Sequence, residues 1–495
     1  MNASNRFYSS LGLLIILNMI IKPVWIFAIE RQVQNSVGNL LYGTYFSLLN
    51  LTLMGGFLLD WGVSAYLNRQ MAAVGPGLAP DTAGHAGTAG HASTAGHALR
   101  LLSIKFLFSV IYTAVILFIA WLAGTKRWDI LGMAIAIQVL TSFFIFLRGI
   151  VTAQQWFRAD AWLSVLDKTL MILVCGCFLY LPAVAGNISI EKFLLAQVAC
   201  TAIAILVAIS LLLKKGFRFS AARDDTPRKQ LLRSALPYAF IVLLMTLHYR
   251  LDGFLLGLLK NEYEAGIYAA AYRILDAANM VGFLGAGFLL PFIARRWSLG
   301  QSFNGVVLDI RHGLMLFSLT TAILFFFLAG WFQELLYNNP STSATEVLQW
   351  CLPALIGYSL VQVYGTVLTA TGHIVSFCYL ALGAALLNTL LNMLLIPLLG
   401  AKGSCGAAIV SQVLFGIASL LLARKKCGVT LHPGSWLLYI FIGAILTASL
   451  YWFRLKELNA VVQIALAGLI VITAAFATRL VSIKKWTAFS GSTGS

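Results

Sequence analysis

The chain has 495 residues, of which 60% are hydrophobic and only 10% are charged, and its formal net charge is +17. An ordinary soluble domain carries roughly 25% charged residues, so this composition excludes a soluble globular protein. A single hydrophobic core cannot account for so much apolar sequence. We therefore expect most of the chain to face lipid or neighbouring membrane helices.

A membrane-crossing helix needs about 20 apolar residues, and about fourteen such stretches follow one another along the chain. The sequence therefore predicts an all-α integral membrane protein. The expected spans of the N-terminal half lie near 10–29, 40–66, 101–123, 129–153, 161–184 and 190–213. Those of the C-terminal half lie near 234–259, 265–292, 312–333, 347–371, 374–398 and 403–424, with two more near 436–453 and 459–478. The first stretch lacks a small-residue cleavage site, so we expect a retained helix rather than a secretory signal.

Basic residues concentrate between the sixth and seventh spans. This segment, 214–233, carries Lys214, Lys215, Arg218, Arg223, Arg228, Lys229 and Arg233. By the positive-inside rule, we expect it and both termini on the cytoplasmic side. A nucleic-acid-binding protein would interleave basic and aromatic residues on a soluble domain, so we expect no nucleic-acid partner.

The basic segment also divides the chain into two similar halves. Gly-Thr-Tyr at 43–45 opens the second span, and Gly-Ile-Tyr at 266–268 opens the eighth. This order predicts two six-helix bundles related by a pseudo-two-fold, and repeats of this kind usually place a transport site at their interface. The expected parts are bundle 1–213, cytoplasmic linker 214–233, bundle 234–430, two additional helices within 431–485, and a flexible tail at 486–495.

A low-complexity loop at 75–99 carries His85, His91 and His97, six residues apart. One interpretation is a metal-binding or proton-sensing loop. However, a six-residue step turns a helix by about 240°, so the imidazoles would not share a face. We therefore expect a flexible cytoplasmic loop without a metal site. The seven cysteines are scattered and no nucleotide-binding or catalytic motif is present, so we expect neither a cofactor nor an enzyme.

Charged residues inside the spans are the candidate site, because a charge that faces lipid is costly. Arg250 is the first candidate, because it lies near the middle of the seventh span. Lys22 is the second, because it lies in the first span, which occupies the same place in the N-terminal half as the seventh span does in the C-terminal half. The candidates for a cationic substrate-binding cavity are Arg250, Lys22, Arg273, Arg148 and Lys168. The candidates for gating or ion coupling are Asp60, Asp252, Asp276 and Asp167. A cationic cavity suits an anionic headgroup such as a pyrophosphate.

Structural alternatives to a cavity role stay open. Arg148 and Lys168 can reach the cytoplasmic headgroups by snorkelling. Arg273 and Asp276 lie three residues apart and can neutralise each other. An ion pair is the alternative for Arg250 and Lys22 as well.

The neighbours of Arg250 differ in what they can do. Asp252 lies about 200° around the helix from Arg250, so we expect it to pair with another helix. His248 and Tyr249 can hydrogen-bond a sugar or fill a packed bundle. Asp60, in another span, is expected to support helix packing or gating.

The most informative stretch, near 387–412, predicts two apolar helices joined by a tight turn. Its marked residues are Asn388, Asn392, Pro397, Gly400, Gly403, Gly406 and Ala407. Other short motifs accompany it in order: Gly-Thr-Tyr at 43–45, Leu-Asp-Trp-Gly at 59–62, Asp252 with Gly257, Gly-Ile-Tyr at 266–268, and Ala-Tyr-Arg at 271–273. Together they resemble, over nearly the whole chain, the Wzx-type flippases of the multidrug/oligosaccharidyl-lipid/polysaccharide (MOP) exporter superfamily.

The resemblance implies a flippase of the bacterial inner membrane. Its implied substrate is an undecaprenyl-pyrophosphate-linked oligosaccharide for O-antigen (lipopolysaccharide), capsule or a related polysaccharide, carried by alternating access. Membrane lipids and the polysaccharide polymerase machinery are the other implied partners. The resemblance also allows transport to be coupled to the movement of an ion, which the sequence does not identify.

Three alternatives stay open. A lipid II flippase shares the helix count and a basic cavity. A multidrug antiporter would more often use twelve helices and an acidic or neutral cavity. A membrane glycosyltransferase or ligase would carry a large periplasmic loop or a catalytic carboxylate motif, whereas the loops expected here are short.

Overall fold

The computed structural model describes residues 3–60, 86–153, 156–181, 188–217, 228–478 and 480. Within these ranges every regular element is a helix. Twelve helical segments of this described part are long and apolar enough to cross a membrane. The predicted all-α membrane architecture is therefore confirmed. His85, the side chains of His91 and His97, and the tail 486–495 lie outside what is described.

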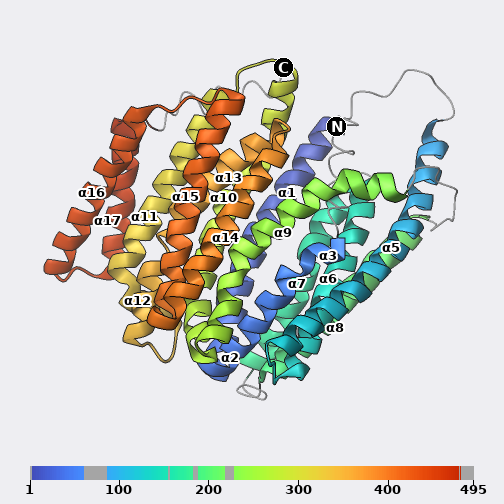
Figure 1. Cartoon of the computed structure of the whole chain (residues 1–495), viewed down its shortest axis with the longest axis horizontal. Coiled ribbons are helices and arrows are strands. Elements are labelled where there is room, and N and C mark those ends of the chain that lie inside the picture. The colour runs from blue at the N-terminus through green and yellow to red at the C-terminus, as the bar shows by residue number, and fades with distance from the viewer. Residues whose placement is uncertain are drawn as a thin grey trace. The chain divides into compact units, whose positions relative to one another are not determined.

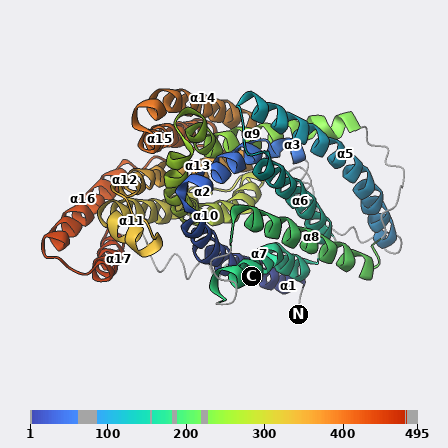
Figure 2. The same ribbon diagram turned by 90° about the horizontal axis from the view of Figure 1, so that it is seen from below.

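The first compact unit is Met1–Leu258. Its helices are α1 (Ala3–Val24), the π-helix η1 (Trp25–Glu30), α2 (Arg31–Met54), α3 (Gly56–Asp60), α5 (Ala86–Leu122), α6 (Trp128–Ala153), α7 (Phe157–Tyr180), α8 (Ile190–Lys214) and α9 (Arg228–Leu259). Within this unit α1 packs beside α7, and α6 packs beside α8 (Figures 1 and 2).

The first two predicted spans form one helical run that is interrupted at Gly38. Pro23 cannot donate a backbone hydrogen bond, and the run continues directly after it as the π-helix Trp25–Glu30. At Gly38 the backbone adopts φ 80° and ψ 166°, a conformation essentially confined to glycine. The chain leaves the helix there, and the second span begins.

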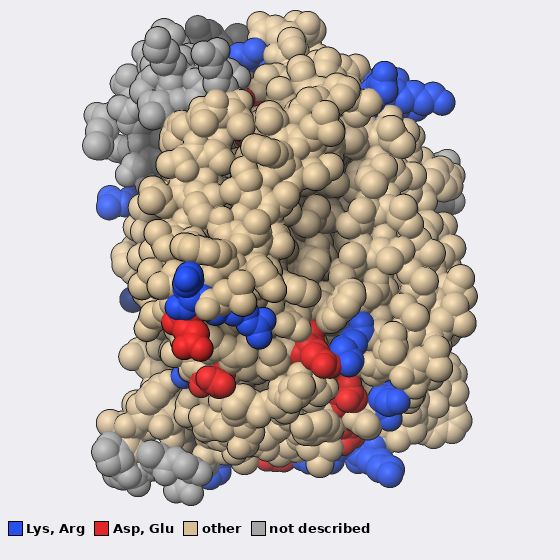
Figure 3. All heavy atoms as spheres, turned by 90° about the vertical axis from the view of Figure 1, so that its left-hand side faces the viewer, with Lys and Arg blue, Asp and Glu red and all other residues tan. Residues whose placement is uncertain are grey.

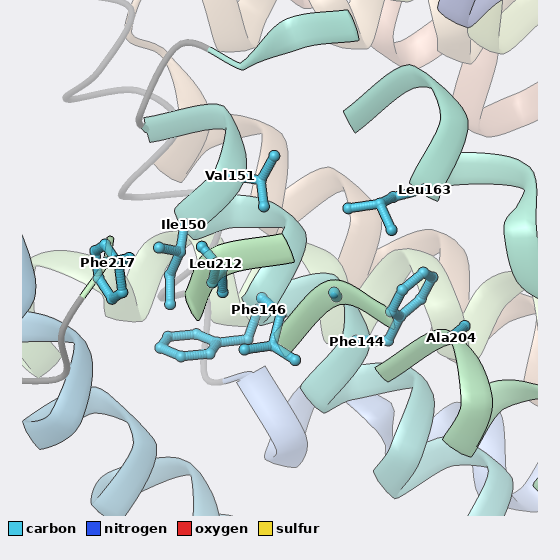
Figure 4. Packing of buried hydrophobic residues seen from close by; sticks show 10 residues of the cluster. Phe144, Phe146, Ile150, Val151, Leu163, Ala204, Leu212 and Phe217 are labelled. Atoms are coloured by element: carbon cyan, nitrogen blue, oxygen red, sulfur yellow. The ribbon is translucent and has the colours of Figure 1, made fainter. Parts of the chain in front are cut away.

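Apolar side chains of α6, α7 and α8 form a packed cluster in the first unit. Figure 4 shows Ile150, Leu212 and Phe217 gathered together, with other side chains of α6 beside them and the side chain from α7 further along the cluster. Ala204 and Ala208 lie one turn apart on α8 and are fully buried in this cluster. Small residues at such positions let membrane helices approach closely, so van der Waals contacts can hold them together.

The helix α9 packs on α2, which places it in the first unit. A Cβ atom at Gly253 would lie 2.4 Å from Asn50 Nδ2, and one at Gly257 would lie 2.4 Å from Ser47 Oγ. This glycine pair, spaced by four residues, is the usual device for close helix contact in membranes. The compact units thus divide after Leu258, whereas the sequence placed the division at 214–233. The two six-helix bundles and their pseudo-two-fold stay predictions.

The second compact unit is Leu259–Ser495. Its helices are α10 (Glu262–Ser298), α11 (Asn304–Leu336), α12 (Thr342–Cys351), α13 (Ala354–Ala370), α14 (Ile374–Leu399), α15 (Ala401–Cys427), α16 (Pro433–Leu455) and α17 (Ala460–Ala477). The last two helices pack on α11, and α14 lies beside α15 (Figure 1). The predicted span 347–371 is divided between α12 and α13, with Pro353 at the start of α13.

The predicted tight turn between α14 and α15 is confirmed. Gly400 links the two helices with φ 60° and ψ −136°. On the inner side, Ser404 Oγ donates to Asn392 Oδ1 (3.0 Å), and Asn388 Nδ2 donates to Ser411 Oγ (3.2 Å). These bonds cross between the helices and satisfy polar groups that lipid cannot satisfy.

Two charged side chains from the start of the second unit bond to the backbone on either side of this turn. Glu264 Oε2 accepts a hydrogen bond from the Ala401 backbone N–H (2.8 Å), at the N-terminus of α15. Lys260 Nζ donates to the Pro397 carbonyl oxygen (3.0 Å), near the C-terminus of α14. Each charge has the sign that the adjacent helix dipole favours.

The surface charge distribution agrees with a membrane-embedded chain. The face that Figure 3 shows is uncharged over most of its upper middle apart from one cation at its left edge, while charged side chains gather in its lower part and near its top. An uncharged band bounded by charge is what a protein surface presents to the hydrocarbon core and the two headgroup regions.

Candidate functional site

Lys22 and Lys168 lie at matching positions along the neighbouring helices α1 and α7. Asn18 Nδ2 donates a hydrogen bond to Ser164 Oγ (2.8 Å), which joins α1 to α7. Each lysine follows its bonded residue by four positions and lies on the same helical face, one turn further along. Lys168 Nζ lies 5.0 Å from the ring centroid of Trp25, which begins η1 directly after α1, so α1 and α7 run in the same direction. The structure therefore brings these two candidates together where α1 meets α7.

Aromatic rings and one carboxylate complete the surroundings of Lys168. Asp167 Oδ2 lies 3.4 Å from Lys168 Nζ. The Trp25 ring beneath the ammonium group stacks on Phe193 at a centroid distance of 5.8 Å. Tyr45 meets the same phenylalanine edge to face. Lys22 is exposed and Lys168 is 27% exposed, so both ammonium groups are accessible for contact with a ligand.

Arg250 lies near the middle of the 21-residue apolar stretch Ala239–Leu259 of α9 and is half-buried. The ring of His248 is buried, and the half-buried Tyr249 ring lies 6.2 Å from it. Asp252 is only 1% exposed and precedes Gly253, which packs on α2. The structure thus places Arg250 near the middle of the apolar stretch of α9, in the same unit as Lys22 and Lys168, and its position in the membrane stays a prediction.

Arg148 lies in an ion pair that the sequence did not predict. Its Nε donates to Asp160 Oδ1 (2.8 Å) and its Nη2 to Asp160 Oδ2 (3.2 Å), which joins α6 to α7. A fork-like pair of this kind fixes both side chains. The pairing gives Arg148 a helix-joining contact, and its role in a substrate cavity stays a prediction. Sequence analysis missed Asp160 because its partner lies on another helix.

Asp60 contacts Lys105, another residue that sequence analysis missed. Lys105 Nζ lies 3.6 Å from Asp60 Oδ1 and donates to the Leu59 carbonyl oxygen (3.1 Å). The lysine is only 6% exposed and also lies over the Phe146 ring. Its position inside the predicted span 101–123 was the available signal. The contact supports the packing role predicted for Asp60, whose participation in gating stays a prediction.

Arg273 is buried in the second unit and bonds to the end of α11. Its Nη1 donates to Tyr337 Oη (3.1 Å), and this hydroxyl donates to the Ala270 carbonyl oxygen (3.2 Å). Asp276 follows on the same helix and is half-buried. The bond to Tyr337 gives Arg273 a helix-joining contact, and its role toward a substrate stays a prediction.

Arg311 is the largest fully buried side chain of the described part, at 1% exposure, and sequence analysis did not single it out. Its Nη2 donates to Ser435 Oγ (2.8 Å), and its guanidinium lies 5.3 Å from the Trp436 ring and 6.0 Å from the Tyr439 ring. A guanidinium stacks well on aromatic faces. Arg311 therefore ties α16 to α11. It was missed because it immediately precedes the predicted span 312–333.

Within the described ranges, no group of three or more His, Cys, Asp and Glu side chains is placed to hold a metal ion. The described candidates carry ammonium, guanidinium and carboxylate groups, which can bind a ligand by charge and hydrogen bonding.

Comparison with solved structures shows the fold. The chain is similar to the lipid II flippase MurJ in an inward closed conformation, with a TM-score of 0.67 and 14% identity over 94% of this chain and 99% of that one. It is also similar to a multidrug resistance MATE family transporter of the MOP superfamily. The inward-facing form gives a TM-score of 0.57 at 13% identity over 83% and 94% of the chains, and the outward-facing form gives 0.56 at 13% over 84% and 93%.

Comparison with protein families shows the relationship. A model described as "Polysaccharide biosynthesis protein" matches residues 6–297, which is more than half of the chain. No curated protein matches the chain in sequence. The matched region contains Lys22, Lys168, Arg250 and Arg273. The chain belongs to the polysaccharide biosynthesis protein family and has the fold shared by MurJ and the MATE transporters of the MOP superfamily.

Proposed function

We propose that the protein is a flippase that moves an undecaprenyl-pyrophosphate-linked oligosaccharide from the cytoplasmic to the periplasmic leaflet. Membership of the polysaccharide biosynthesis protein family is the observation that carries this proposal. The membrane-spanning helices and the transporter fold support it. The proposed products are O-antigen, capsule or a related polysaccharide of a bacterial cell.

Lys22 and Lys168 are the proposed first contacts of the pyrophosphate. They lie at one depth on neighbouring helices, and both are accessible. Ammonium groups are point charges with three donors each, and their hydrogen bonds to phosphate oxygens are stronger than neutral ones. Asp167 beside Lys168 would hold that ammonium group in place. Its negative charge would also weaken the attraction between the ammonium group and the pyrophosphate, so that the substrate can leave.

Arg250 is the proposed third cation, and Arg273 is a weaker candidate because Tyr337 already accepts one of its hydrogen bonds. The headgroup would cross by alternating access while the polyprenyl chain stays in the bilayer. Support comes from MATE family transporters with this fold, which are known in inward-facing and outward-facing conformations. Asp60, Asp252, Asp276 and Asp167 are the proposed gating or coupling residues.

Depletion of the protein from its bacterium tests the proposal. We expect a complete oligosaccharide repeat to build up on undecaprenyl pyrophosphate, because synthesis continues while the step that removes the repeat from the cytoplasmic leaflet stops. Mass spectrometry of extracted polyprenyl-linked lipids measures this pool, and cells with the gene restored are the control.

Two other outcomes would replace the proposal. Accumulation of lipid II would assign the protein to peptidoglycan precursor export. Unchanged lipid pools together with greater sensitivity to cationic drugs would assign it to multidrug efflux.

A further inference from the structure

Two buried amide side chains converge between α10 and α13 in the second unit. Asn279 is 5% exposed and lies near the middle of the 37-residue α10, and Gln362 is 8% exposed and lies near the middle of α13. A Cβ atom placed on Gly282 would lie 3.4 Å from Asn279 Oδ1 and 3.2 Å from Gln362 Cγ. Both side chains thus reach the same small space beside this glycine.

The two amides present complementary polar atoms there. Asn279 Oδ1 is a hydrogen-bond acceptor, and Gln362 Nε2 is a donor. Neither atom has a hydrogen-bond partner anywhere in the described part of the chain, although both are buried. Polar groups buried away from water are nearly always paired, and at this depth lipid supplies no partner. An unpaired acceptor and an unpaired donor on two side chains that reach the same space are therefore an uncommon and costly combination.

The combination selects one chemical class. A hydroxyl group both donates and accepts, so it can accept from Gln362 Nε2 and donate to Asn279 Oδ1. A metal cation would meet the oxygen but oppose the N–H donor, and a phosphate or carboxylate oxygen would meet the donor but oppose the oxygen. We infer that Asn279 and Gln362 form a subsite for a sugar hydroxyl of the transported glycan.

This inference rests on the proposed function, which supplies a ligand rich in hydroxyl groups. Both amides are covered in the present conformation, so a sugar reaches them only after α10 and α13 separate. A site that opens and closes in this way would recognise the glycan during translocation rather than in the resting state. A resident water molecule offers the same chemistry, and the test below distinguishes the two sources.

The test uses purified full-length protein and two probes, undecaprenyl pyrophosphate and the same lipid carrying one N-acetylglucosamine. Dissociation constants come from titrating the thermal-unfolding midpoint with each probe. For the wild type we expect the sugar to tighten binding by about tenfold, as a pair of neutral hydrogen bonds would. We expect Asn279→Leu and Gln362→Met each to lose most of this sugar-dependent gain while still binding the sugar-free lipid.

Gln412→Met is the matched control. Gln412 lies at the packed contact of α13 and α15, is fully buried, and both polar atoms of its amide lack a partner among the described residues. The same chemical change there removes an unpaired amide away from the proposed subsite. We expect it to leave the sugar-dependent gain unchanged. Because all three substitutions remove unpaired polar groups, we expect none to lower the unfolding midpoint of the free protein.

The outcomes separate this inference from the proposed function. If the wild type binds both probes equally, or if Asn279→Leu and Gln362→Met keep the tenfold gain, the amides hold at most water and the subsite is wrong while lipid binding stands. If neither probe shifts the wild type, the proposed function itself is contradicted. If Gln362→Met does not fold, Asn279→Leu decides alone, because loss of the acceptor is expected to remove the same sugar-dependent gain.

Discussion

Export of the polysaccharide is expected to fall by about 100-fold or more when Lys22 and Lys168 are both replaced by glutamine. A hydrogen bond to a charged group contributes about 1.5–3 kcal/mol, and each 1.4 kcal/mol is tenfold. Two ammonium groups at one depth would contact the pyrophosphate together, because α1 and α7 are joined by the Asn18–Ser164 hydrogen bond. The rate of surface polysaccharide appearance after induction in depleted cells measures the effect.

Two control variants show that charge is the cause. Replacing both lysines by arginine keeps two cations at the site and should restore a large part of export. Lys456→Gln removes an exposed lysine beyond the end of α16 and should export normally. Normal export by the double glutamine variant, at matched membrane levels, would rule out Lys22 and Lys168 as the headgroup contacts.

Gly403→Val is expected to remove most of the folded protein. A Cβ atom at Gly403 would lie 2.3 Å from the Leu395 carbonyl oxygen and 2.6 Å from the Leu395 carbonyl carbon. Both are backbone atoms of α14, so the clash can be relieved only by moving one helix away from the other. Overpacking typically costs about 1–3 kcal/mol, and a backbone clash belongs at or above the top of this range. Moving the helices apart would also break the hydrogen bonds between Asn392 and Ser404 and between Asn388 and Ser411.

Fluorescence-detected gel filtration of detergent-solubilised, tagged protein measures the loss, and the unfolding midpoint of the remaining fraction supports it. Gly383→Val is the matched control on α14, because no atom lies within 4 Å of the Cβ position there. We expect this control to elute as a single symmetrical peak at the wild-type level. Equal behaviour of the two valine variants would show that the α14–α15 contact is looser than the structure indicates.

The fold was predictable where the physics is local. About 20 apolar residues must become a helix in a bilayer, because unpaired backbone groups cannot face lipid. Applied to the length of each apolar stretch, that rule predicted the positions of the membrane-spanning helices from the sequence. Pro397, Gly400 and Gly403 likewise marked the α14–α15 turn, since the backbone at Gly400 has a positive φ. The gap between the predicted spans 10–29 and 40–66 contains Gly38, but it did not show that η1 and the start of α2 continue the helical run up to this glycine.

The site was predictable only in part, because pairing depends on which helices become neighbours. The sequence marked Arg148 as an intramembrane charge but not its partner Asp160, which lies on the next helix. It did not single out Lys105 or Arg311, whose buried positions follow from packing against α3 and α16. It marked Lys22 and Lys168 separately, and only the α1–α7 contact shows that they lie together. Their function in substrate binding stays a proposal.

The most direct test of flippase activity is translocation in liposomes containing only the purified protein and an undecaprenyl-pyrophosphate-linked oligosaccharide. A glycosidase that cannot cross the membrane is added outside, and the protected sugar is measured by mass spectrometry. We expect protein-free liposomes to keep their inner-leaflet sugar and liposomes with the wild-type protein to lose it. Full protection in the presence of folded, correctly inserted wild-type protein would contradict the assignment as a flippase.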